Sequence, residues 1–100
     1  MKRHVVRLAE EAERDLIDIY RYIATHDTAE SAERVLAGLE DLCASLAELP
    51  KHGHFPSELE RIGVMHSREV RFKPYRVIYE IVGRNVFIHC ILNGCRDMYP

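Results

Sequence analysis

Side chains able to act on a phosphodiester are concentrated in the second half of this chain. Metal-free cleavage of RNA needs an activated 2′-hydroxyl, positive charge to stabilise the phosphorane-like state, and a proton for the leaving 5′-oxygen. The residues of suitable type are Arg71, Arg76, Arg96, His66, His89 and Tyr99. Arg71 and Arg76 stand on either side of an expected turn at Lys73 and Pro74. We therefore expect these two arginines to lie close together.

Structural roles compete with each of these catalytic roles. Arginines on a sheet face commonly pair with carboxylates, here Glu69 or Glu80, and solvated pairs of this kind add little stability. In a regular strand, His89 would lie on the same side as the apolar residues Phe87 and Ile91. This favours an imidazole in the core or at the sheet edge. Tyr99 lies next to the last residue, where a loose tail is the default. For Arg71, Arg76, His89 and Tyr99 the structural roles are favoured.

Histidines and cysteines raise the question of a metal site. His52 and His54 are two residues apart, and His66 with Cys90 or Cys95 would have to complete the set. This spacing lacks the paired ligands of zinc sites, so we expect an exposed polar loop, no metal and no cofactor. The three cysteines form neither a disulfide framework nor a CxxC motif. Reduced thiols of this kind are typical of a cytoplasmic protein.

Composition and charge bound the class of protein. With 100 residues, 47% of them hydrophobic and 30% charged, we expect one domain over residues 1–100. No apolar stretch is long enough for a membrane helix and no signal peptide is present, so a cytoplasmic protein without a membrane partner is expected. Residues 1–50 carry 6 Lys and Arg against 11 Asp and Glu, whereas residues 51–100 carry 8 against 5. This balance favours two faces with different partners and disfavours direct, sequence-specific nucleic-acid binding.

Hydrophobic periodicity predicts two helices in the first half, after a short strand at residues 3–8. Apolar residues recur at helical spacing from residue 9 to residue 23 and again from residue 35 to residue 49. Asp27, with Glu30 three residues later, is the expected cap of the second helix, with Thr28 as the alternative, and Pro50 is expected to end it. A connection this short makes the two helices antiparallel neighbours.

The second half is predicted to be a loop followed by a sheet. Residues 51–66 form the loop, and strands are expected at residues 67–72, 76–82 and 86–92. Gly83 supplies hairpin chemistry between the last two strands. The near-continuous apolarity of the last strand indicates a central place in the sheet. The order β-α-α-β-β-β predicts an α+β fold in which a helical hairpin packs on an antiparallel sheet.

Three stretches carry a family resemblance. Residues 9–22 (AEEAERDLIDIYRY) have an acidic start and an AERDL..I..Y pattern, residues 71–81 (RFKPYRVIYEI) contain YRVIYE, and residues 91–97 read ILNGCRD. In order and spacing they resemble the RelE/ParE toxin superfamily of type II toxin–antitoxin systems. The third is similar to the Leu-His-Gly-Arg-Arg-Asp ending of the ParE-like branch. The chain departs from that ending at Asn93, in place of His, and at Cys95, in place of Arg.

The resemblance implies a partner, a target and a site. Toxins of this superfamily are kept inactive by an antitoxin that wraps the helical hairpin and the sheet edge. ParE-type members poison DNA gyrase without performing chemistry, whereas RelE-type members cut messenger RNA in the ribosomal A site without a metal. The implied target-binding residues are Asn93, Gly94, Cys95, Arg96 and Asp97, together with Arg71 and Arg76. The competing interpretation of residues 93–97 is a strand-ending turn in which Asp97 pairs with Arg96.

Three hypotheses follow. The favoured one is a ParE-like gyrase inhibitor, which has no catalytic residues of its own and is neutralised by a cognate antitoxin. The second is a RelE-like messenger RNA endonuclease that uses Arg71, Arg76 and Arg96 with His66 or Tyr99. The third is a degenerate toxin that retains only antitoxin binding, which the residues at positions 93 and 95 make credible.

Overall fold

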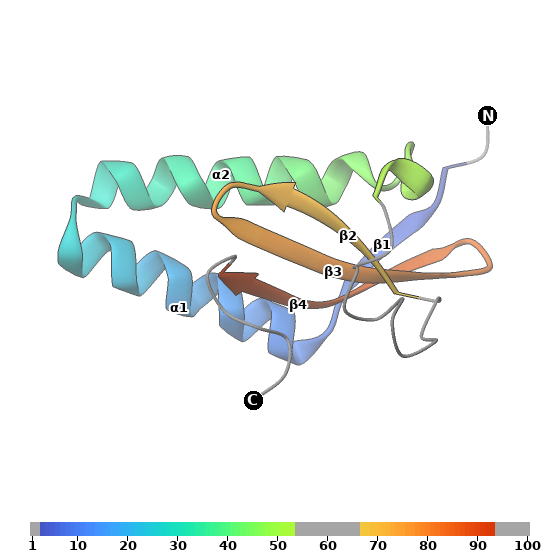
Figure 1. The fold of residues 1–100 in the computed structure, drawn as a ribbon, viewed down its shortest axis with the longest axis horizontal. Helices are drawn as coiled ribbons and strands as arrows, with labels where there is room; N and C mark the ends of the chain where they lie inside the picture. Colours follow the sequence, from blue (N-terminus) through green and yellow to red (C-terminus); the bar gives the residue numbers. More distant parts are fainter. Residues whose placement is uncertain (1–2, 54–66, 94–100) are drawn as a thin grey trace.

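A computed structural model describes residues 3–53 and 67–93 of the chain. It has the expected α+β order, with two helices packed on one side of a four-stranded sheet (Figure 1). The elements are β1 (Val5–Leu8), α1 (Glu10–His26), α2 (Ala29–Ser45), a short 3₁₀ helix (Pro50–His52), β2 (Ser67–Phe72), β3 (Tyr75–Val82) and β4 (Asn85–Asn93). Neither α-helix is long and apolar enough to cross a bilayer.

The two helices run antiparallel, side by side, as their short connection predicts (Figure 1). The Thr28 side chain accepts a hydrogen bond from the backbone N–H of Ser31 at 3.0 Å, so Thr28 caps α2. The expectation that Asp27 is the cap is wrong, because Asp27 ends α1, where its backbone N–H donates to the carbonyl of Ile23. Thr28, one residue further along, has the extended backbone of an N-cap, with φ −132° and ψ 158°.

Helix α2 ends earlier than expected. Its last residue is Ser45, whose hydroxyl donates to the carbonyl of Leu42 at 2.6 Å. Serine side chains that bond a carbonyl in this way compete with the helical hydrogen bonds. Pro50 instead begins the 3₁₀ helix, and Leu49, expected in the apolar stripe, is 60% exposed. The turn after Ser45 still buries Leu46 completely.

The sheet has the strand order β1-β4-β3-β2, so β4 is central, as its apolarity predicted. Strands β2, β3 and β4 are antiparallel neighbours, but β1 pairs with β4 in parallel, and the sheet is therefore mixed. The antiparallel helices return the chain to the start of β1, where the N–H of His4 donates to the carbonyl of Ala47. Strand β2 runs in the same direction as β1. The chain then reverses twice, between β2 and β3 and between β3 and β4, so β4 also has the direction of β1.

The core lies between the helices and one face of the sheet. Its largest fully buried hydrophobic side chains come from α2, the turn after it and the central strands: Leu39, Leu46, Val77, Tyr79, Val86 and Ile88. The hydroxyl of Tyr79 donates to the carbonyl of Pro50 at 2.6 Å and accepts from the N–H of Gly53 at 2.9 Å. A Cβ at Gly53 would lie 2.5 Å from the backbone oxygen of Glu69. Only a glycine fits where this segment crosses the sheet.

Candidate functional site

Strand pairing gathers three charged residues on the sheet face opposite the helices, which we call the outer face. Val70 and Val77 point into the core, so the alternating residues of the same strands point outward. Arg71 is the register partner of Arg76, and Glu69 precedes Arg71 by two residues in β2. The tight turn between β2 and β3 therefore brings the two arginines together, as the sequence predicted.

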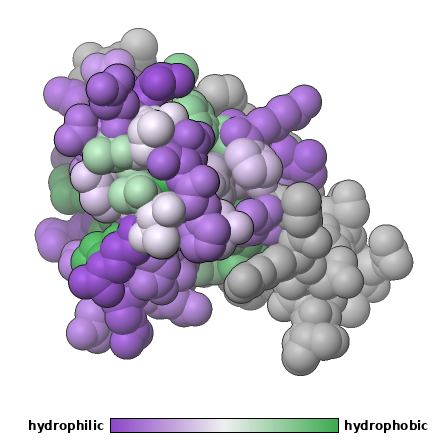
Figure 2. Space-filling model, turned by 90° about the vertical axis from the view of Figure 1, so that its left-hand side faces the viewer, coloured by the Kyte–Doolittle hydropathy of each residue, from purple (hydrophilic) through white to green (hydrophobic). Residues whose placement is uncertain are grey.

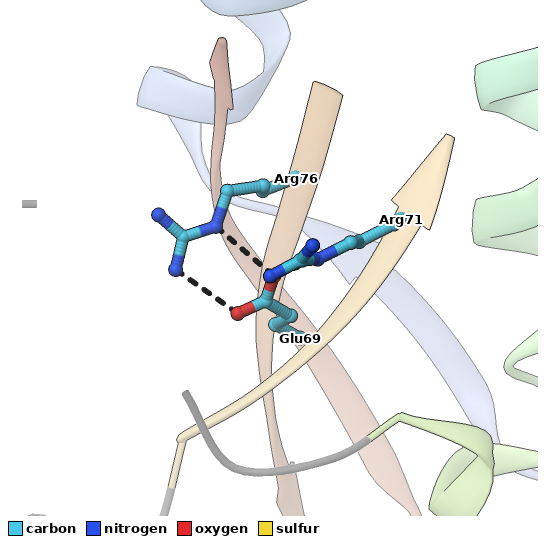
Figure 3. Close-up of polar contacts among 3 residues, drawn as sticks. All are labelled: Glu69, Arg71 and Arg76. Carbon is cyan, nitrogen blue, oxygen red and sulfur yellow. Dashed lines mark hydrogen bonds and ion pairs between the residues drawn. The ribbon is translucent and has the colours of Figure 1, made fainter. Parts of the chain in front are cut away.

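One carboxylate connects both arginines. Oε2 of Glu69 accepts hydrogen bonds from Nε of Arg71 at 2.8 Å and from Nε of Arg76 at 3.0 Å. Its Oε1 accepts from Nη2 of Arg76 at 3.0 Å (Figure 3). The side chain of Glu69 is 1% exposed and that of Arg76 8%, whereas that of Arg71 is 57% exposed. The cluster therefore has a buried ion pair at its base and one arginine at the surface.

The charge of Glu69 is maintained by its partners. Burial raises the pKa of this carboxyl group, but the hydrogen bonds and positive charges of Arg76 and Arg71 outweigh that effect. The pKa of Glu69 is consequently below its ordinary value, and the group is ionised at neutral pH. The sequence left open whether the arginines pair with Glu69 or Glu80, and the structure selects Glu69. The expectation of solvated arginines is wrong for Arg76, which is buried.

His89 lies neither in the core nor at the sheet edge, the two places expected for it. The register between β3 and β4 shifts at Ile78/Tyr79, where Ile78 pairs with Cys90 and Tyr79 pairs with Ile88. His89 is the extra residue of this β-bulge, and its side chain is 45% exposed. Its Nε2 lies 3.8 Å from a carboxylate oxygen of Glu80. The prediction assumed that side chains alternate between the two faces along the whole strand. A bulge adds one residue, so the alternation after it is the reverse of that before it.

The role of Asp15 could not be predicted from the sequence. A carboxylate oxygen of this α1 residue accepts the backbone N–H of Ile91 at 2.8 Å. Strand β1 ends at Leu8, opposite Ile88, so beyond that point α1 takes the place of a neighbouring strand. Burial raises the pKa of Asp15, and the nearby acidic groups of Glu11 and Asp18 add to the rise. Helical periodicity alone marks this residue only as part of a solvated acidic face.

A groove of about 420 Å³ lies beside this contact. Its lining comes from α1, the start of β3 and the end of β4: Asp15, Asp18, Ile19, Tyr22, Tyr75, Ile91 and Asn93. Asn93 is the last residue of β4 and the register partner of Tyr75. It is also the first residue of the expected target-binding segment. Gly94, Cys95, Arg96 and Asp97, which complete that segment, lie outside the described residues, as do His66 and Tyr99.

A second groove, of about 610 Å³, is formed mainly by the two helices. Leu16, Ile17, Tyr20 and Leu36 supply apolar surface, and Glu13 and Glu40 are among the charged residues that line it. Ile17 is 50% exposed. The end of the molecule at the connection between α1 and α2 is largely hydrophilic, with small apolar areas between the polar residues (Figure 2). On the face that Figure 2 shows, the apolar surface is therefore confined to small areas.

The described cysteines are poor nucleophiles. Burial raises the pKa of both Cys43 and Cys90 to about 11, so both thiols are protonated at neutral pH. Within residues 3–53 and 67–93, no group of three or more His, Cys, Asp and Glu side chains is arranged to hold a metal ion. His54 and His66, from the expected polar loop, lie outside these ranges.

The comparisons with known proteins agree with this architecture. The structure is similar to a chain of the chromosomal ParDE toxin–antitoxin system from P. aeruginosa, with a TM-score of 0.77 and 17% identity over 93% of this chain and 98% of that one. It is also similar to a chain of the toxin–antitoxin complex RelBE2 from Mycobacterium tuberculosis, with a TM-score of 0.67 and 21% identity over 91% and 98%. At these identities the likeness establishes the fold alone. No curated protein matches the chain.

The family assignment comes from the sequence of almost the whole chain. Residues 6–98 match the model of the ParE toxin of the type II toxin–antitoxin system parDE. That range includes both helices, all three strands of the antiparallel part of the sheet and the arginine cluster of the outer face. The chain therefore belongs to the ParE toxin family.

Proposed function

We propose that this ParE-type toxin inhibits DNA gyrase by binding it through the outer face of the sheet and residues 93–97, and that it performs no chemistry itself. The observation that carries the proposal is the difference in exposure between Arg71 and Arg76. Arg76 is buried against Glu69, so within the described residues Arg71 is the only exposed arginine of the expected catalytic set. A carboxylate that neutralises one of two arginines opposes the stabilisation of a phosphorane-like state. The arrangement therefore favours recognition over cleavage.

The helical groove supports an antitoxin as the second partner. Both structural neighbours come from toxin–antitoxin systems. Here the groove combines apolar residues such as Leu16 and Leu36 with the carboxylates of Glu13 and Glu40. Such a surface suits the apolar face of a partner helix flanked by basic residues. The proposal assigns this groove to the cognate antitoxin, leaves the outer face to the target, and assumes a cytoplasmic location for both interactions.

A gyrase assay tests the proposal. Purified toxin, added to gyrase, ATP and relaxed plasmid, should prevent supercoiling and should accumulate linear DNA after denaturation of the complexes. Arg96→Ala should lose this inhibition while it still binds the antitoxin, if the segment after β4 contacts gyrase. Full inhibition by Arg96→Ala would show that this segment is not the inhibitory one.

The adjacency of Arg71 and Arg76 is the observation that supports the RelE-like alternative, a metal-free messenger RNA endonuclease. Added to ribosomes programmed with a message, the toxin should then release shortened message and leave gyrase active. Inactivity in both assays, with antitoxin binding intact, would instead support a degenerate toxin. In that case the residues at positions 93 and 95 are the first to replace, by Asn93→His and Cys95→Arg.

A further inference from the structure

We infer that Arg71 is a receptor for a single carboxylate of the target protein, and that Glu69 is the positioning residue that orients it. This inference rests on the proposed function, because it concerns the chemistry of the same outer face. It assigns different roles to three neighbouring residues. Arg71 contacts the target, Glu69 holds Arg71, and Arg76 holds Glu69.

The geometry of Arg71 leaves its recognition groups available. Its Nε donates to Glu69 at 2.8 Å, and the side chain is 57% exposed. Its two terminal nitrogens make no hydrogen bond to any residue in ranges 3–53 and 67–93. The planar guanidinium group carries these nitrogens as a fork that matches the two oxygens of a carboxylate. The two terminal nitrogens of Arg71 can thus donate to both oxygens of one carboxylate, while its Nε is already bound to Glu69.

The anchor beneath Arg71 is rigid. Both oxygens of Glu69 are held by Arg76, at 3.0 Å each, and Glu69 is 1% exposed (Figure 3). Arg71 and Arg76 are register partners in β2 and β3, so the backbone positions are held by the sheet as well. An exposed arginine ordinarily loses side-chain entropy when it binds. Here much of that loss has occurred on folding, which favours binding by pre-organisation.

The local charge favours a carboxylate over a phosphate backbone. Glu69 pairs with both Arg71 and Arg76, so a carboxylate already lies beside the exposed arginine. On the same sheet, Glu80 places a further carboxylate 3.8 Å from His89. Nucleic-acid affinity is built from several phosphate contacts over an extended basic surface. A single oriented fork suits one acidic side chain of a protein.

The first test measures the binding of the full-length toxin to the gyrase holoenzyme without DNA. Arg71→Ala should weaken binding on the order of 10- to 100-fold, as expected for loss of an oriented charge-assisted pair. Arg71→Lys should recover only part of the affinity, because an ammonium group cannot form the fork. Arg84→Ala is the matched control, since it removes an equal charge from an exposed arginine of the β3–β4 turn, and it should bind like the parent.

The second test isolates positioning from folding. The double variant Glu69→Leu/Arg76→Leu removes the buried Glu69–Arg76 ion pair as a unit, so neither of these two charges stays buried without the other, and the fold should persist. It should lose about as much gyrase affinity as Arg71→Ala. Introduced into an Arg71→Ala background, the same double change should have no further effect. A purely structural role would weaken binding again in that background. If the leucine variant does not fold, Glu69→Leu/Arg76→Met, which fills more of the volume of the arginine, replaces it in the same cycle.

The outcomes are distinct. If the parent binds gyrase and Arg71→Ala binds equally well, the inference is wrong while the proposed function stands. If the toxin binds plasmid DNA without gyrase and Arg71→Ala abolishes that binding, the ligand is a phosphate and the inference is overturned. A parent that neither binds nor inhibits gyrase overturns the proposed function and this inference together.

Discussion

Glu69 shows how one residue can serve both the fold and the site. Its carboxylate is buried, and its partners Arg71 and Arg76 come from two strands that meet across a tight turn. Removing one member of such a cluster leaves a buried charge without compensation, which is far more costly than losing a surface pair. The identity of residue 69 therefore affects stability as well as recognition.

We predict that Glu69→Gln lowers the free energy of unfolding at pH 7 by about 3 to 5 kcal/mol. Because the pKa of Glu69 is lowered in the folded state, its stabilising effect is present above its ordinary pKa of 4.5 and is lost as the pH falls through the folded value. The difference between parent and variant should thus shrink on acidification. Urea unfolding from pH 7 to pH 3 measures it.

The control for this titration is Glu80→Gln, whose carboxylate is 25% exposed and lies 3.8 Å from His89. Its effect at pH 7 should be below about 1 kcal/mol. A Glu69→Gln effect that stays constant from pH 7 to pH 3 would show that the ionised form of Glu69 is not what stabilises the fold.

At the scale of the elements, the helical hairpin depends on the short connection between α1 and α2. Asp27 ends one helix and Thr28 begins the next, so the reversal takes place within these two residues. The hydroxyl of Thr28 satisfies the N–H of Ser31, one of the donors that a helix start leaves without a helical partner. Capping at this point helps hold the helices as neighbours over the sheet.

We predict that Thr28→Ala lowers the free energy of unfolding by about 1 kcal/mol, the usual value of an N-cap. Asp27→Ala is the matched control, because its side chain makes no capping hydrogen bond to the described residues, and its effect should be below about 0.5 kcal/mol. The midpoint of urea denaturation measures both variants. A larger loss for Asp27→Ala than for Thr28→Ala would assign the cap to Asp27 after all.

For the whole molecule, stability depends on the contact between the helical layer and the sheet. Leu39 of α2 is completely buried and belongs to the same core cluster as Val77 and Ile88 of the central strands. In contrast, the outer face of the sheet carries the charged cluster. One layer of contacts thus holds the fold, while the opposite side of the same strands presents Arg71 at the surface.

Leu39→Ala should destabilise the protein by roughly 2–5 kcal/mol, because it opens a cavity in this core. Leu49→Ala is the matched control, since Leu49 is 60% exposed and should tolerate the change with a loss below about 0.5 kcal/mol. Thermal or urea unfolding of the two variants gives the comparison. Equal effects would mean that α2 does not pack on the sheet through Leu39.

The sequence by itself determined the helices, the three consecutive strands and the closeness of Arg71 and Arg76. These features depend on periodicity and on short turns, which act between residues near one another in the chain. The tight turn at Lys73 and Pro74 brings the two flanking arginines together as register partners in β2 and β3. The central place of β4 could also be predicted, because a strand with two neighbours is apolar over most of its length.

Only the tertiary structure decided the features that depend on distant residues. The parallel pairing of β1 with β4, the bond from Ile91 to Asp15 and the choice of Glu69 over Glu80 each follow from how layers and strands meet. The bulge at His89 reverses the alternation of side chains between the two faces of the sheet, although the sequence there looks like one regular strand. Local patterns specify which face of an element is apolar, but the partner of a buried polar group is set by three-dimensional packing.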